Sequence, residues 1–169
     1  MTLSEQSESK GFTLIELLIV IVVMGIIMAL VTTNLSGARQ RASDSQKKSN
    51  LRQLQTALHL YYGNFHIYPN AAGNNGFNFY ACGISGNDKC TTTFTVGTTE
   101  YMARLPLTSS GQNDFRYYPC NGGDDFRLKI NLQVTSDVEI LESQARCPAA
   151  TCAGKSLSFS ASDYVLCGN

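Results

Sequence analysis

The sequence has little charge, and the charge that it has is balanced. Charged residues make up 15% of the 169 residues, with 13 Lys and Arg against 13 Asp and Glu, whereas a typical soluble domain has about 25%. A net charge of zero argues against a protein held to nucleic acid or anionic lipid by bulk charge. The sequence also lacks a P-loop, a dinucleotide-binding glycine fingerprint and a G-x-S-x-G motif. We therefore expect no enzymatic activity and no cofactor.

Metal-binding patterns are missing as well. The cysteines lack the tight paired spacing of structural zinc sites, and neither histidine is near them along the chain. The turn at 121–125 contains two carboxylates but not the fixed ligand spacing of a calcium loop, so we interpret it as a plain turn. No metal site is expected.

What the sequence does have is one long apolar segment. From Phe12 to Val31, 17 of 20 residues are apolar, the exceptions being Thr13, Glu16 and Gly25. A helix of this length spans about 30 Å, the thickness of the hydrocarbon core of a bilayer. A cleaved secretory signal would have a shorter core and a positive region before it, whereas here two acids and one base precede the run. The segment predicts a membrane-inserted helix.

Glu16 is the one ionisable residue of this segment. A carboxylate within a bilayer costs several kcal/mol unless it is paired or neutralised, which makes Glu16 a candidate functional residue. Alternatively, Glu16 lies near the membrane edge and reaches the headgroups. Cleavage before Phe12 would create an α-amino group one helical turn from Glu16. Paired between two molecules, these groups would set the axial register of neighbouring helices.

Residues 10–16, Lys-Gly-Phe-Thr-Leu-Ile-Glu, and the apolar run that follows resemble the N-terminal motif of type IV pilins and pseudopilins. In that family a membrane-embedded prepilin peptidase cleaves after the glycine and methylates the new N-terminal residue. The resemblance implies cleavage after Gly11, methylation of Phe12 and a role for Glu16 in assembly. It also implies a leader peptide at 1–11, a transmembrane and assembly half-helix at 12–34, and an exported globular domain at 35–169.

The helical pattern continues to about Tyr62. An apolar stripe for packing recurs at helical spacing, formed by Leu51, Leu54, Leu58 and Tyr61. Arg41, Lys48 and Arg52 share another face, which we interpret as a solvated side of the helix near phospholipid headgroups. Capture of DNA by this face is the alternative, and no other feature of the sequence supports it.

The second half of the chain predicts a small sheet. Residues 126–134 alternate strictly between apolar and polar, which indicates a strand with one buried and one wet face. Residues 115–118 precede it across the turn 119–125 as a hairpin, 92–96 and 164–167 are shorter strands, and 64–89 read as loop. The expected fold is α+β, with one long N-terminal helix packed on a small antiparallel sheet. The resemblance implies the same type IV pilin-like fold.

All six cysteines follow the apolar run, which favours disulfides formed in an oxidising compartment. Six cysteines allow 15 pairings. We expect two local bonds, Cys82–Cys90 and Cys147–Cys152, and one long-range bond to the C-terminal region, Cys120–Cys167. The resemblance also favours the long-range bond.

The predicted topology has the domain outside the cell membrane. Five bases lie between 39 and 52 after the apolar run, a distribution that by the positive-inside rule alone would place this side in the cytoplasm. The processing motif and the cysteines outweigh that signal. The resemblance implies a single-pass protein of the inner membrane that later joins an extracellular pilus or a periplasmic pseudopilus.

The function implied by the resemblance is that of a structural pilin subunit of a type IV pilus or related filament. Its expected partners are copies of itself and other pilins, prepilin peptidase, an inner-membrane assembly platform and, before assembly, membrane lipid. A pseudopilin of a type II secretion or DNA-uptake system is the alternative within the family. A single-pass, membrane-anchored, disulfide-rich binding protein is the alternative from another class.

Overall fold

The structure, a computed structural model, describes residues 11–74, 76, 78–107, 114–152 and 154–168, and at 30–34 the helix backbone only. The predicted leader, apart from Gly11, lies outside the described residues. The chain divides into two compact units, Met1–Arg39 and Gln40–Asn169. Helix α1 (Leu14–Phe65) begins in the first unit and ends in the second, close to the end that the periodicity predicts.

The first unit consists of the apolar part of α1. Its large apolar side chains are exposed along the whole described stretch, from 89% at Leu14 to 44% at Val20. A helix that is apolar all round needs an apolar environment or other helices to cover it. Among the described residues, no helix meets the combined criteria of length and apolar character for crossing a membrane.

The second unit contains a five-stranded antiparallel sheet in the order β8-β7-β5-β6-β9. Its members are β5 (Arg116–Cys120), β6 (Asp125–Asn131), β7 (Thr151–Cys152), β8 (Lys155–Ser156) and β9 (Asp163–Cys167). The 3-10 turn η1 (Asn121–Gly123) joins β5 to β6, so the predicted hairpin is confirmed. The predicted strand at 164–167 corresponds to β9, which pairs with β6.

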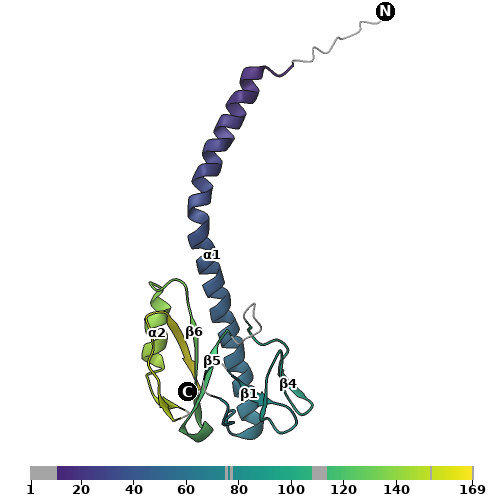
Figure 1. The fold of residues 1–169 in the computed structure, drawn as a ribbon, viewed down its shortest axis with the longest axis vertical. Helices are drawn as coiled ribbons and strands as arrows, with labels where there is room; N and C mark the ends of the chain where they lie inside the picture. The colour runs from purple at the N-terminus through teal and green to yellow at the C-terminus, as the bar shows by residue number, and fades with distance from the viewer. Residues whose placement is uncertain (1–10, 75, 77, 108–113, 153, 169) are drawn as a thin grey trace, which may run out of the picture. The chain divides into compact units, whose positions relative to one another are not determined.

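Two further hairpins and one helix complete the unit. The hairpins are β1 (Tyr80–Cys82) with β2 (Asp88–Lys89), and β3 (Phe94–Val96) with β4 (Thr99–Met102). The first lies in a segment that the sequence indicates as loop. Helix α2 (Val138–Arg146) was not expected from the sequence. In the second unit, α2 and the five-stranded sheet lie on one side of α1, and β1 to β4 lie on the other (Figure 1).

The apolar stripe of α1 forms the centre of the core. Leu51, Leu54 and Leu58 are fully buried and Tyr61 is nearly so, which confirms the stripe. Burial of one such leucine contributes roughly 2–3 kcal/mol. The same cluster includes side chains from both hairpins and the large sheet, among them Phe79, Phe94, Tyr117, Phe126 and Leu128. The α+β arrangement of one long helix on small antiparallel sheets is therefore as expected.

The prediction of a solvent-exposed outer face for β6 holds for Asn131 but was wrong for Arg127 and Lys129. Arg127 and Lys129 point to that face, yet they are only 8% and 9% exposed. The chain after α2 lies over Arg127, whose Nε donates to the carbonyl oxygen of Pro148 at 3.4 Å. Lys129 Nζ pairs with Asp163 Oδ2 at 2.9 Å. These charges tolerate burial because each has a carboxylate partner, that of Arg127 being Asp125.

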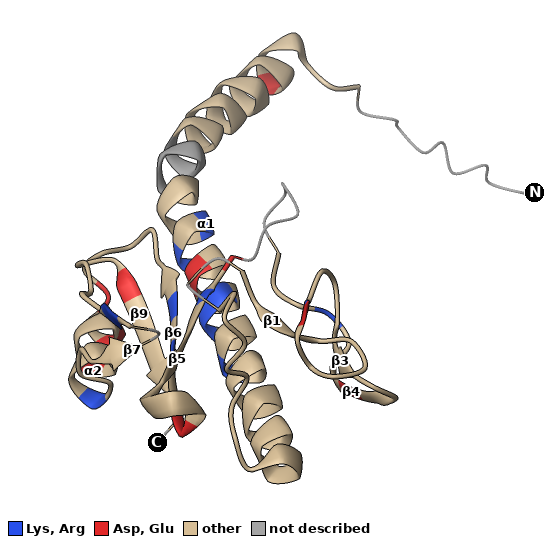
Figure 2. Ribbon diagram, turned by 60° about the horizontal axis from the view of Figure 1, so that its bottom comes forward, with Lys and Arg blue, Asp and Glu red and all other residues tan. Residues whose placement is uncertain are grey.

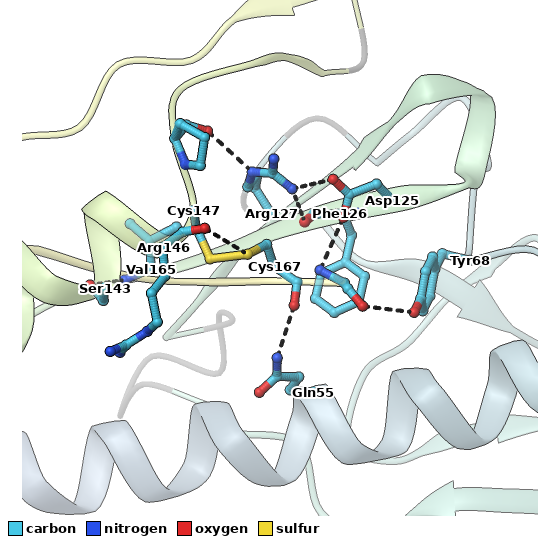
Figure 3. The surroundings of a disulfide bond; sticks show 12 residues. Gln55, Tyr68, Asp125, Phe126, Arg127, Ser143, Arg146, Cys147, Val165 and Cys167 are labelled. Carbon is cyan, nitrogen blue, oxygen red and sulfur yellow. Dashed lines mark hydrogen bonds and ion pairs between the residues drawn. A yellow bond between two sulfur atoms is a disulfide. The ribbon is translucent and has the colours of Figure 1, made fainter.

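Of the three disulfides, one has the expected pairing and two do not. Cys82 is bonded to Cys90, as predicted. The other bonds are Cys120–Cys152 and Cys147–Cys167, so the expected Cys147–Cys152 and Cys120–Cys167 pairs were wrong. The reason is α2, which packs beside β9 and is followed directly by its C-cap residue Cys147, next to Cys167 (Figure 3). β7 pairs with β5 and so brings Cys152 opposite Cys120.

Candidate functional site

The N-terminal segment around Glu16 has a defined local geometry. Thr13 precedes the first residue of α1, and its backbone N–H donates to Glu16 Oε2 at 3.0 Å. The Thr13 hydroxyl donates to the same oxygen at 2.8 Å and accepts from the Glu16 N–H at 3.3 Å. This reciprocal pattern is a capping box, in which residues three apart satisfy the free N–H groups at a helix start. Thr13 therefore fixes where α1 begins and how the Glu16 side chain lies.

The predicted processing site lies just outside the helix. Gly11 and Phe12 are non-helical, and Phe12 is 86% exposed. A Cβ atom added at Gly11 would meet nothing within 4 Å, so no contact within the chain requires glycine there. The peptide bond between Gly11 and Phe12 is thus accessible in the described residues. Its role as a cleavage site remains a prediction.

The capping box gives Glu16 a partner within its own chain. Both donors to Glu16 Oε2 belong to Thr13, and no contact for Oε1 is seen among the described residues. The carboxylate therefore keeps lone pairs available for another donor, such as an amino group. The sequence signal for the box, Thr-x-x-Glu before an apolar run, was readable, but Thr13 did not enter the predicted site.

The basic face of α1 differs from its prediction. Figure 2 shows Lys and Arg gathered on the part of α1 beside the sheet. Lys48 is only 8% exposed and pairs with Asp137, the N-cap residue of α2, and with Glu139 at 3.4 Å. Arg52 pairs with Glu139 at 3.1 Å and donates to the Tyr164 hydroxyl. Only Arg41 of the three is exposed without such a partner among the described residues. The interpretation as a solvated side was wrong for Lys48, because α2 covers it.

These contacts shift the pKa values of the groups involved. The hydrogen bond from Lys48 lowers the pKa of Asp137 in spite of partial burial, and the N–H of Glu139 adds to the effect. Burial opposes the charged form of Lys48, but its bonds to Asp137 and Glu139 outweigh burial and raise its pKa. The pair is therefore ionised at neutral pH and holds the start of α2 against α1.

Asp44 attaches the segment after β6 to α1. Its carboxylate is buried and accepts the backbone N–H groups of Gln133 and Val134 at 2.8 to 2.9 Å. Lys47 Nζ donates to the carbonyl oxygen of Asn131 at 2.9 Å. Two side chains of one helical turn thus satisfy backbone groups that a loop would otherwise leave unpaired. Nothing in the sequence pattern marks Asp44 for this role.

The C-terminal residues are held from several sides (Figure 3). Gln55 of α1 donates to the carbonyl oxygen of Cys167 at 2.9 Å, and Asp125 accepts the N–H of Gly168 at 3.0 Å. The Tyr68 hydroxyl contacts the Gly168 carbonyl oxygen and also His59 Nδ1 at 3.0 Å. His59 thus has a packing contact. In the part of the chain that the structure describes, no three His, Cys, Asp or Glu side chains converge as metal ligands.

Comparison with known proteins supports the predicted family. The model for the prokaryotic N-terminal methylation motif matches residues 7–32. The chain is 29% identical over 140 residues to the type IV major pilin protein PilA of Myxococcus xanthus, covering 79% of this chain and 57% of the relative. It is 37% identical over 62 residues to the type II secretion system core protein G of Escherichia coli, covering 37% of this chain and 43% of the relative. The chain thus spans about half the length of these curated relatives.

A third relative gives the same picture. The type II secretion system core protein G of Vibrio cholerae is 30% identical over 67 residues, which cover 40% of this chain and 46% of the relative. No solved structure is significantly similar to the chain. The similarity to core protein G is therefore confined to a minor part of the chain, whereas the similarity to the Myxococcus pilin extends over most of it.

Proposed function

Because the chain belongs to the type IV pilin and pseudopilin family, we propose that it is a structural subunit of a type IV pilus or a related filament. The observation that carries the proposal is the arrangement at the N-terminus. A glycine and an exposed Phe12 precede a capped helix whose first turn contains Glu16 and whose large apolar side chains from Leu14 to Met28 are exposed. As a filament subunit, the chain has no catalytic role.

Processing comes first. Prepilin peptidase cuts after Gly11, removes residues 1–11 and methylates Phe12. Residues 12–34 then hold the subunit in the inner membrane, and the domain of residues 35–169 lies outside. The exposed apolar side chains of α1 then exchange lipid for the helices of other subunits on an inner-membrane assembly platform. Assembly is favourable where helix packing outweighs the loss of lipid contacts and of freedom of motion.

Glu16 serves this exchange through its charge. Thr13 occupies one of its oxygens, so the carboxylate can accept a further bond from the amine of Phe12 in a neighbouring subunit. Pairing of the two removes the penalty of a lone buried charge in the filament core. Because the pair forms at one axial offset, it also selects the register between subunits.

A pseudopilin of a secretion system is the second candidate, favoured by the 37% identity to core protein G over 62 residues. The pilin interpretation is preferred because the match to the Myxococcus pilin covers 79% of this chain. Fibre imaging separates the two, since a pilus extends from the cell surface and a pseudopilus remains in the periplasm.

The test is Glu16→Ala in the full chain, expressed with prepilin peptidase and an assembly platform, with a change at an exposed residue of β4, Glu100→Ala, as the matched control. We expect Glu16→Ala to insert into the membrane at the normal level and to yield no sheared filaments. The control should assemble normally. Normal filaments from Glu16→Ala would contradict the proposed role.

A further inference from the structure

Two surface features on opposite sides of α1 in the second unit are left uncovered by the residues that the structure describes. The first is the outer stripe of α2, where Val138 and Leu141 are 67% and 72% exposed beside Glu142. The inner side of α2 is buried through Ile140 and Ser143, so the helix already has its packing face. Two large aliphatic side chains one helical turn apart on the other face are therefore available for a second contact.

The second feature is a groove between α1 and the segment after β4. It encloses about 350 Å³ and is lined by the amides of Gln46, Asn50 and Gln53 together with Met102, Arg104 and Leu107, among others. Met102 and Leu107 are only partly buried against the core and give the groove an apolar part. Arg104 is the one charged side chain among its lining residues. No carboxylate of the described residues pairs with it.

These two features complement each other in apolar character and charge. The α2 stripe projects aliphatic side chains and a carboxylate, and the groove offers apolar surface and a guanidinium. Glu142 has only a loose contact with Arg146, at 3.8 Å, and both side chains remain more than half exposed. Arg104 is therefore a suitable partner for Glu142 across an interface.

One molecule cannot make this contact with itself. α2 lies on one side of α1, and the strand that leads into the groove, β4, lies on the other (Figure 1). Contact between two different faces of identical subunits is heterologous, and such contacts generate open helical filaments when the rotation between subunits does not close into a ring. We propose that the α2 stripe of one copy, Val138, Leu141 and Glu142, docks in the groove at Met102, Arg104 and Leu107 of the next copy. This inference rests on the proposed function and adds a contact between exported domains.

Photo-crosslinking in assembled filaments tests the contact directly. A benzophenone amino acid replaces Leu141 in the full chain, filaments are sheared and irradiated, and the linked peptides are mapped by mass spectrometry. We expect dimers linked to residues 102–107. The matched control places the same group at Ile84, which is 92% exposed in the β1–β2 turn, and should give no link to the groove. Links from position 141 to other regions of the domain would overturn the proposal.

Charge reversal provides the second measurement. Glu142→Arg and Arg104→Glu should each lower the yield of sheared filaments by about fivefold, the upper range for an exposed ion pair. The double variant should recover most of the yield, because the pair is restored with its signs exchanged. A double variant no better than the single ones would contradict the contact. If the unsubstituted chain forms no filament at all, the proposed function fails, whereas normal filaments with links elsewhere refute only this contact.

Discussion

Lys48 lies beneath the start of α2, where its ammonium pairs with Asp137, the residue that caps that helix. The contact joins residues 89 positions apart in the sequence. Asp137 has two tasks, since its carboxylate also accepts the N–H of Glu139 at 3.0 Å. The orientation of α2 therefore depends on a basic residue of α1. The same holds for the exposed stripe of α2, which we propose contacts a neighbouring subunit.

This pair makes stability depend on pH in a defined direction. The pKa of Asp137 is lowered in the folded protein, chiefly by Lys48, so its contribution is complete above the unfolded pKa of about 3.9 and is lost as pH falls through the lower folded value. Asp137→Asn keeps a good capping residue but removes the charge. We expect a melting temperature that falls less steeply below pH 4 than that of the parent chain, measured in detergent.

Asp163 accounts for the loss of stability at low pH that we expect to remain in Asp137→Asn. The N–H of Ser160 and the ammonium of Lys129 lower the pKa of Asp163 in spite of its burial. If the melting temperature of Asp137→Asn falls with pH as steeply as that of the parent chain, the Lys48–Asp137 pair does not contribute to the pH dependence of stability.

Asp44→Ala should cause a larger loss of stability than changes to the exposed polar residues of α1. The substitution leaves the partly buried N–H groups of Gln133 and Val134 without their carboxylate acceptor, at a cost of about 2 kcal/mol for the two groups. Chemical denaturation of the full chain in detergent measures the free energy of unfolding. Ser45→Ala, an exposed neighbour, is the control and should change it by less than about 0.5 kcal/mol.

Removal of the Cys147–Cys167 bond should loosen α2 from β9. The bond closes a loop of 20 residues, and chain-entropy estimates assign such a bond roughly 3 kcal/mol. We expect the paired replacement by serine to increase hydrogen exchange in α2 while β3 and β4 stay protected. Equal loss of protection in both regions would show that the bond stabilises the whole domain.

The sequence predicts those parts of the fold that follow from local periodicity. The stripe at Leu51, Leu54 and Leu58 repeats at helical spacing, so its burial could be foreseen. Strand β6 was recognised from its alternation, but alternation alone cannot show that Arg127 and Lys129 are covered by chain that comes later. Helix α2 and the β1–β2 hairpin were missed; α2 has only nine residues, fewer than the roughly 11 or more over which a helical period is normally recognised.

The candidate site was predictable to a similar degree. Glu16 was identified because a single charge in an apolar run is conspicuous. Lys48 was assigned to solvent because its partner Asp137 is distant in sequence, and side-chain spacing on one helix cannot show such a partner. The pairing of Cys147 with Cys167 was missed for the same reason, since it depends on how α2 packs beside β9.

Thr13→Val tests whether the capping box supports Glu16. Valine keeps the shape of threonine but removes two of the three hydrogen bonds between these residues, at a cost of about 1 kcal/mol to the start of the helix. We expect normal membrane insertion, faster hydrogen exchange in the first turn of α1, and a reduced yield of filaments. Thr13→Ser retains the hydroxyl and should assemble like the parent chain. If valine and serine behave alike, the hydroxyl has no role in assembly.

The central claim is that the chain is processed and assembled as a pilin subunit, and mass spectrometry of the N-terminus tests it most directly. Cleavage after Gly11 leaves 169 − 11 = 158 residues. The account predicts that the protein recovered from filaments begins at Phe12 and carries one methyl group on its α-amine. An intact Met1, or a first residue beyond position 30, would contradict it.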